Sequence, residues 1–231
     1  IEEYVEDNMD ILLYPLFFVG CITLLFCCFR FFQESPFWGT AWVFFLVITL
    51  AYDNLILACG RWIGFGETLE TLSMIRYLLH VLLIPTLVYV SLDFIRRTEV
   101  GWIKGVMVQV FFHLYTFSLT IVGVFHDFLW VHMESISING IDRYFVSDSP
   151  FSITFFFAVI PMVIASIVIW RKMEWSVLLL GCTLTFLLGF VSYLFSFFAL
   201  GSFTELVFIA ILVLTEYKLK QEDYTSNLYE A

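Results

Sequence analysis

Residues 50–82 carry an unusual density of polar and charged side chains within an otherwise apolar sequence. Among them, Asp53 and His80 pair a carboxylate with an imidazole, the side chains that serve acid–base chemistry or bind transition metals. An ionised side chain held in hydrocarbon costs at least about 2.5 kcal/mol. Such residues therefore line a bundle interior or a wet cavity, and we expect the functional site in this stretch.

The candidate ligand-binding residues are expected at matching depths on neighbouring helices. Asp53 lies about 10 Å below the end of its apolar run near Gly60, and His80 lies about 13 Å below the start of the next run, taking a rise of 1.5 Å per residue. Adjacent antiparallel helices would therefore bring the two side chains together. The full candidate set is Asp53, Asn54, Arg61, Arg76, His80, Gln109, His113 and Glu205.

Each candidate also has a purely structural interpretation. Arg61 and Arg76 lie near an interface, where long basic side chains reach lipid headgroups. Glu205 also fits a solvated helix end. Asp53 is too deep for either explanation, so it forms a structural lock with Arg76 or His80, or it lines a ligand or ion site. Gln109 and His113 share one helix face and suit hydrogen bonding between helices.

The sequence does not identify a cofactor, and it offers too few residues to assign a metal centre. Asp53 and His80 are the two firm metal-ligand candidates, and two ligands are too few to hold an ion. We therefore assign no metal ligands, no cofactor and no catalytic residue at this stage.

Composition identifies the class of protein. The chain has 231 residues, of which 61% are hydrophobic and 20% aromatic, and its mean hydropathy is +0.93. Soluble domains contain about 45–50% apolar residues, so this is a membrane protein whose first partner is the lipid bilayer. The net charge of −10 argues against a nucleic-acid surface, which would be basic. The five cysteines lie in or at the end of apolar runs and are interpreted as small buried residues.

Seven apolar runs are long enough to span about 30 Å of hydrocarbon. We place them at residues 9–30, 37–59, 72–95, 103–126, 150–170, 175–199 and 201–218. The fold class is therefore an all-α, seven-helix transmembrane bundle, with residues 1–218 as one domain. The last two runs are separated by a very short turn, so six spans with a broken final helix is the alternative.

The distribution of basic residues predicts the orientation of the bundle. With seven spans, eight basic residues fall on one side and three on the other. The side with the excess is cytoplasmic by the positive-inside rule, which places the N-terminus outside and the C-terminus in the cytoplasm. The localisation is therefore a membrane crossed several times, in the cell surface or in an organelle. Residues 219–231 are polar and are predicted to be a disordered cytoplasmic tail.

The one long loop, residues 127–149, is predicted to lie outside and to contain a β-hairpin. Residues 133–146 alternate in polarity and are broken by Asn139-Gly140, a strong signal for a two-residue hairpin turn. A second pattern, Gly181, Thr185 and Gly189 at a spacing of four, allows close helix approach. It predicts packing inside the bundle, or alternatively a seam for a homodimer or a membrane-protein partner.

Three functions fit these features. The first is binding of a lipid-like or small hydrophobic ligand in an outward-facing polar pocket between the second, third and seventh runs. The second is an enzyme acting on a lipid or isoprenoid, with Asp53 and His80 as acid–base groups or metal ligands. The third is an accessory structural subunit of a larger membrane complex.

Overall fold

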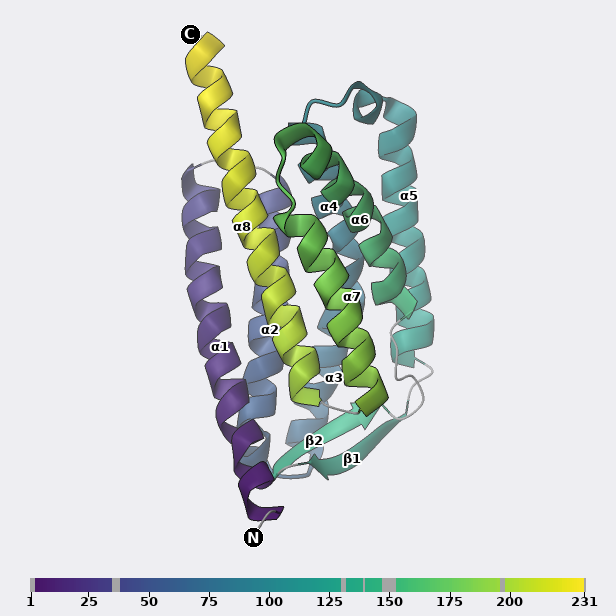
Figure 1. Ribbon diagram of the computed structural model, residues 1–231. Helices are drawn as coiled ribbons and strands as arrows, with labels where there is room; N and C mark the ends of the chain where they lie inside the picture. The colour runs from purple at the N-terminus through teal and green to yellow at the C-terminus, as the bar shows by residue number, and fades with distance from the viewer. Residues whose placement is uncertain are drawn as a thin grey trace.

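The computed structural model describes residues 3–34, 38–129, 132–138, 140–146, 153–195 and 198–230. Within these ranges, long helices run side by side along one axis, with a two-stranded sheet at one end of the bundle (Figure 1). The helices are α1 Glu3–Glu34, α2 Trp38–Ile63, α3 Glu67–Leu83, α4 Leu87–Arg97, α5 Val106–Val122, α6 Ile153–Met173, α7 Val177–Phe195 and α8 Phe198–Glu230, with short helical turns η1 Ile84–Thr86, η2 Gly101–Lys104 and η3 Gly123–Leu129.

In the part of the chain that the structure describes, six helical stretches are long and apolar enough to cross a membrane. They are Ile11–Gln33, Trp38–Ile63, Glu67–Arg97, Val106–Leu129, Thr154–Met173 and Ala199–Glu222. The protein is therefore a multi-pass membrane protein, as its composition predicts. Helix α7 is apolar but shorter in its described part, so the seventh span and the orientation of the bundle stay predictions.

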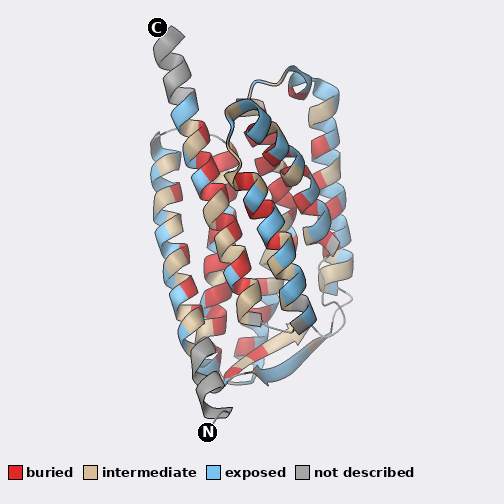
Figure 2. Ribbon diagram, in the orientation of Figure 1, coloured by how far each residue is buried: buried red, intermediate tan, exposed pale blue. Residues whose placement is uncertain are grey.

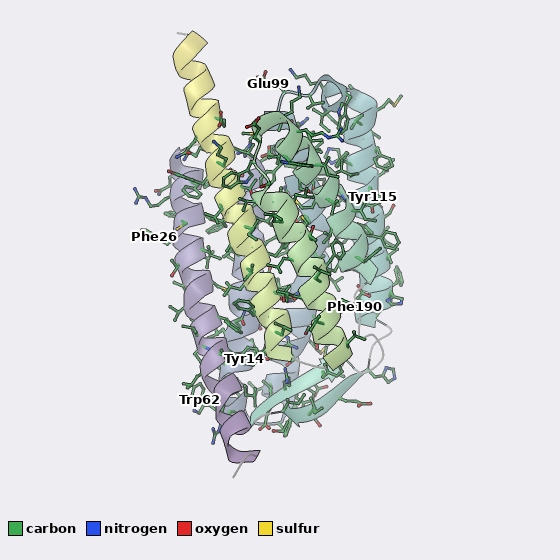
Figure 3. The ribbon with its side chains drawn as sticks, viewed as in Figure 1. Tyr14, Phe26, Trp62, Glu99, Tyr115 and Phe190 are labelled. Atoms are coloured by element: carbon green, nitrogen blue, oxygen red, sulfur yellow. The ribbon has the colours of Figure 1, made fainter. Side chains whose placement is uncertain are left out.

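Burial divides the helices into a central and a peripheral group. In the apolar segments of α2 and of α3–α4, 61% of the residues are buried inside the bundle, whereas in those of α1 and α5 only 22% of the residues are buried (Figure 2). Phe26 and Phe190, labelled in Figure 3, point away from the bundle, as lipid-facing side chains do. Cys21, Cys28 and Cys182 are buried as free thiols, in agreement with their interpretation as small core residues.

Proline interrupts one of the predicted spans. Helix α3 ends at Leu83 and α4 begins at Leu87, and the intervening turn η1 contains Pro85. Proline has no backbone N–H and its ring clashes with the preceding turn, so the α-helical ladder breaks there. Pro161 lies inside α6, which continues on both sides of it.

Helices α7 and α8 pack side by side in antiparallel directions. The indole Nε1 of Trp175, just before α7, donates a hydrogen bond to Thr215 Oγ1 at 3.2 Å. Farther along α7, a Cβ added at Gly181 would lie 2.7 Å from Ile211 side-chain atoms. Later positions on α7 therefore meet earlier positions on α8, so the two helices run antiparallel over their described residues.

The stripe of small residues on α7 faces the interior of the bundle. Gly181 contacts α8, Thr185 is 5% exposed, and Gly189 lines an internal cavity. These contacts agree with the interpretation of the stripe as packing within the bundle. A homodimer or partner seam at these positions stays a prediction.

The predicted β-hairpin is confirmed. Strands β1 Met133–Ile138 and β2 Ile141–Val146 are antiparallel, and Ile138 pairs with Ile141 next to the turn. Asn139 lies outside the described residues, whereas Gly140 has φ of 73°, the left-handed conformation that this turn requires. The hairpin packs closely against the end of α2, where a Cβ on Gly60 would collide with the backbone oxygen of Asp142.

The last helix is longer than the sequence predicts. Helix α8 continues to Glu230, through the segment after residue 218 for which disorder was expected. Leu219 is 1% exposed, so the apolar side of the helix still packs beyond the predicted span. On the other side, Lys218 Nζ and Glu222 Oε1 form an ion pair at 2.6 Å, one helical turn apart.

A buried charge cluster, which the sequence did not predict, joins three helices at the end opposite the hairpin. Arg97 Nη2 lies 2.6 Å from Asp93 Oδ2, and Arg97 Nη1 lies 2.9 Å from Glu216 Oε1. Thr40 Oγ1 donates a hydrogen bond to the same Glu216 oxygen. Arg97 is one of the eight basic residues counted on the cytoplasmic side, but its side chain is only 4% exposed. The cluster therefore ties α2, α4 and α8 together.

Candidate functional site

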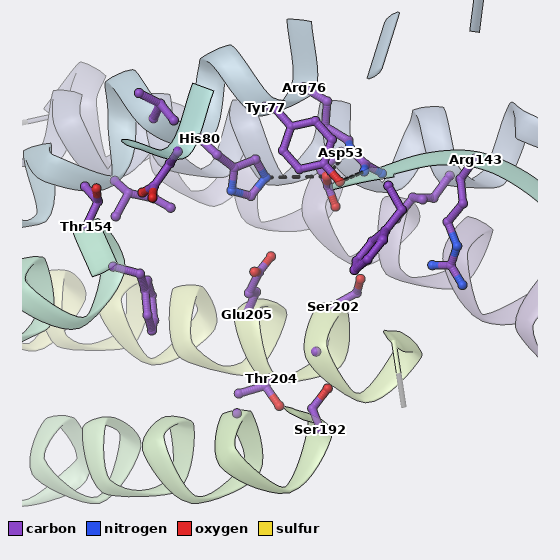
Figure 4. Close-up of a pocket in the computed structure, with 18 of the residues that line it drawn as sticks. Asp53, Arg76, Tyr77, His80, Arg143, Thr154, Ser192, Ser202, Thr204 and Glu205 are labelled. Carbon is purple, nitrogen blue, oxygen red and sulfur yellow. Dashed lines mark hydrogen bonds and ion pairs between the residues drawn. The ribbon is translucent and has the colours of Figure 1, made fainter. Parts of the chain in front are cut away.

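A cavity of about 490 Å³ lies at the hairpin end of the bundle (Figure 4). This volume is within the 300–1,000 Å³ typical of pockets that hold small molecules. Its wall is built from α1, α2, α3, α6, α7, α8 and β2, with the short turns η1 and η3. Four of the predicted site residues line it, namely Asp53, Arg76, His80 and Glu205.

The centre of the charged wall is Asp53 on α2. Its carboxylate Oδ1 lies 3.2 Å from Arg76 Nε and 3.4 Å from His80 Nε2. Arg76 and His80 are four residues apart, so both lie on the face of α3 that is turned toward α2. Tyr77 Oη accepts a hydrogen bond from Arg76 Nη2 at 3.0 Å and holds the guanidinium in place. The predicted meeting of Asp53 and His80 is therefore present in the structure.

Glu205 approaches the same group from α8. Figure 4 shows its carboxylate directed across the cavity toward His80 and Asp53. One ligand atom from each of Asp53, His80 and Glu205 can be chosen so that all three lie within 4.8 Å of one another. Among the described residues, Glu205 has neither an ion pair nor a hydrogen-bond partner. Three helices therefore direct two carboxylates and one imidazole at one small region.

The hairpin contributes a second arginine to the cavity. Ile141, Arg143 and Phe145 alternate along β2, so their side chains share one face of the strand. Ile141 and Arg143 are buried, and both Arg143 and Phe145 line the cavity. Arg143 Nη1 donates a hydrogen bond to Tyr14 Oη at 3.4 Å. The strand thus covers the end of the bundle and fixes a cation inside it.

Apart from Asp127 of η3, the rest of the wall is apolar or made of small side chains. Leu57, Val81, Ile84 and Phe155 supply apolar surface from α2, α3, η1 and α6. On the opposite side, α7 and α8 present small residues, namely Thr185, Gly189, Ser192, Gly201, Ser202 and Thr204. A Cβ added at Gly189 would meet no atom within 4 Å, so there is open space beside this residue.

The other four candidates lie away from the cavity. Asn54 is fully buried, and its Nδ2 donates a hydrogen bond to the Leu50 carbonyl at 2.9 Å. Arg61 is exposed at the end of α2. Gln109 and His113 are on α5, where His113 Nδ1 lies 3.4 Å from Tyr89 Oη. Because the cavity wall contains none of the four, the structure does not bring them together with Asp53.

Sequence reasoning missed Tyr14 and Arg143. Tyr14 is fully buried and lies beside Pro15 in the first apolar run, where its neighbours in sequence give no sign of a site. Arg143 carried a recognisable signal, because it occupies the alternating position between Ile141 and Phe145. A charge on the apolar face of a strand indicates that this face covers a polar interior.

Comparison with known proteins gives no relative. No protein-family model, curated protein or solved structure matches the chain. The function must therefore be argued from the cavity and its side chains.

Proposed function

We propose that this protein binds a lipid-like amphiphile in the cavity at the hairpin end. The observation that carries the proposal is the two-sided wall of the cavity. Charged groups from α2, α3 and α8 form one side, and aliphatic and aromatic groups form another. Ligand pockets combine a mostly apolar lining with a few convergent polar groups in this way.

The charged side suits an oxygen-rich polar head. Arg76 supplies N–H donors, and Ser202 supplies a hydroxyl on the α8 side. The apolar side suits a hydrocarbon chain, which Leu57 and Phe155 would contact. Since the cavity is set among membrane-length helices, an amphiphile can reach it from the bilayer, with the hairpin acting as a lid.

The proposed orientation follows from charge and connectivity. We infer that α7 is a seventh span, because it is apolar and packs antiparallel to α8. The positive-inside rule then assigns the N-terminus, the hairpin and the cavity to the outer side. A cysteine introduced at Ser137 should react with an impermeant maleimide in intact vesicles, whereas one introduced at Gln221 should react only after permeabilisation.

Photo-crosslinking tests the binding proposal. Protein in lipid nanodiscs is irradiated with a diazirine-bearing fatty acid, and the modified peptides are mapped by mass spectrometry. We expect crosslinks at cavity residues such as Leu57 and Phe155 in addition to the lipid-facing background. Gly189→Phe should remove the cavity crosslinks, because its ring occupies the open space beside α7. The matched variant Leu187→Phe, at a residue 61% exposed on the same helix, should leave them unchanged.

Two outcomes would contradict the proposal. Labelling confined to lipid-facing residues such as Phe26 and Phe190 would show that the cavity takes no amphiphile. Equal cavity labelling in the wild type and Gly189→Phe would show that the labelled site is elsewhere.

An enzyme acting on the same class of molecule is the second candidate. It is favoured by the contact of 3.4 Å between Asp53 and His80, since a carboxylate beside an imidazole can orient it as a general base. Lipid extracts of cells that express the wild type and His80→Gln at equal levels should then differ in one lipid species. Identical extracts would leave binding without catalysis as the function.

A further inference from the structure

We propose that Asp53, His80 and Glu205 together bind one divalent transition-metal ion. The three residues come from α2, α3 and α8, and one donor atom from each can be chosen within a mutual distance of 4.8 Å. The sequence alone offered two of these ligands. The third is supplied by the fold, because α8 packs close enough to direct Glu205 at the other two (Figure 4). This site goes beyond the proposed binding of an amphiphile and does not depend on it.

The spacing of the donors agrees with coordination by a small ion. Metal–ligand bonds of 2.0–2.1 Å in a tetrahedral site place neighbouring ligand atoms about 3.3 Å apart. The separation between Asp53 Oδ1 and His80 Nε2 is 3.4 Å. Glu205 lies on a flexible side chain, and a movement of about 1–2 Å would bring it to the same spacing. One imidazole and two carboxylates form a donor set that suits Zn²⁺ or Mn²⁺.

The charge of the site favours a cation. Two carboxylates converge within a membrane-length span, and Arg76 contacts only one of them at 3.2 Å. Glu205 has no ion pair among the described residues, although an unpaired charge in an apolar span is costly. A divalent ion between the three donors would neutralise this carboxylate. It would also explain why the acid is directed at Asp53 rather than at solvent.

The cavity leaves room for a further ligand on the ion. All three donors line the space of about 490 Å³, and Gly189 keeps part of it open. With three protein ligands, a fourth position would face this space, the arrangement typical of metal sites that exchange water or bind a ligand. In the same cavity, an oxygen atom of an amphiphile head could occupy this position.

Metal binding by the purified protein tests the site directly. The protein is expressed with a histidine-free tag, stripped with chelator and titrated with Zn²⁺ in detergent by calorimetry, and its metal content is measured separately by elemental analysis. We expect one Zn²⁺ per chain and a Kd at least tenfold weaker in Glu205→Gln. The control Glu222→Gln makes the same change at an exposed position on the same helix and should retain the wild-type Kd.

Substitution with Co²⁺ provides a readout that a purely structural role would not change. Coordination by the three residues should give visible d–d absorption in the wild type and Glu222→Gln. His80→Gln should lose it, and this second variant decides the matter if Glu205→Gln does not fold. The proposal is overturned if folded wild-type protein binds no stoichiometric Zn²⁺, or if Zn²⁺ affinity is equal in the wild type, Glu205→Gln and His80→Gln. Because these measurements contain no fatty-acid probe, their failure would leave the amphiphile proposal standing.

Discussion

Replacing Arg97 should destabilise the protein far more than replacing Glu216, one of the two acids that Arg97 contacts. In the wild type this one guanidinium contacts two buried carboxylates, at 2.6 Å and 2.9 Å. Arg97→Met keeps most of the side-chain volume but leaves both carboxylates without their cation. Loss of one partner from a buried ion pair costs about 3–5 kcal/mol. In Glu216→Gln the side-chain amide can still accept the hydrogen bond from Thr40, and Arg97 keeps Asp93 as its counter-ion. The free energy of unfolding should therefore fall by only about 1–2 kcal/mol.

The assay is thermal unfolding in one detergent, followed by tryptophan fluorescence and by recovery of the monodisperse species. For a chain of this size, 1 kcal/mol corresponds to about 2–4 °C, so Arg97→Met should lower the apparent Tm by about 6–20 °C. Glu216→Gln should lower it by about 2–8 °C. Lys104→Met removes an exposed basic residue at the same end and should change little. The reasoning is refuted if Arg97→Met melts within about 2 °C of the wild type, or if Glu216→Gln is the more damaging change.

Three further substitutions test the packing around the cavity. Gly60→Ala should loosen the hairpin and speed its cleavage by protease, because the added methyl collides with the hairpin backbone. The control Gly101→Ala places its methyl in open space and should not change the cleavage rate. Equal cleavage rates in the two variants would contradict the contact between Gly60 and the hairpin. Gly181→Ala should lower the free energy of unfolding by about 1–3 kcal/mol, because its methyl overpacks against α8. Gly189→Ala should leave the Tm unchanged. If Gly189→Ala were the more destabilising change, the small-residue stripe could not face inward as described. Asp53→Asn should lower the free energy of unfolding by about 3–5 kcal/mol, because Arg76, whose side chain is 8% exposed, would lose its counter-ion. An unchanged Tm would show that the pair of Asp53 and Arg76 does not stabilise the fold.

The features that the sequence predicted are those encoded by local pattern. Apolar runs of membrane length give helices because a backbone in hydrocarbon must satisfy its own hydrogen bonds. Asn139-Gly140 between alternating segments gives the hairpin, since the turn and the strands are encoded within a dozen residues. The contact between Asp53 and His80 was predictable too, because depth along two antiparallel helices follows from the rise per residue.

The features that were not predicted depend on contacts between distant segments. Glu216 is on α8, and the residues that contact it, Arg97 and Thr40, are more than a hundred residues earlier in the chain. Depth gives the height of such a residue but not the face that it presents. Asn54 illustrates the limit, because it neighbours Asp53 in sequence yet turns to a carbonyl of its own helix. His113 shows the same limit, because it lies in an apolar stretch of sequence yet its side chain is on the exposed face of α5.

The contrast between the two charge clusters separates a structural role from a ligand-binding one. Both combine arginine with two carboxylates among α2, α8 and the span formed by α3 and α4. At the end opposite the hairpin the cluster is closely packed, and a Cβ on Gly39 would collide with the Asp93 side chain. At the hairpin end, a methyl added at Gly189 meets nothing. Charges that serve only to lock helices together need no open volume beside them.

The lining of that open volume indicates which molecule suits it. Its size of about 490 Å³ is within the range of pockets that hold small molecules. Water would solvate Asp53 and Glu205, but it would leave Leu57, Val81 and Phe155 in contact with a polar medium. A molecule with both a polar head and an apolar chain matches both walls, and this match supports the proposed binding of an amphiphile.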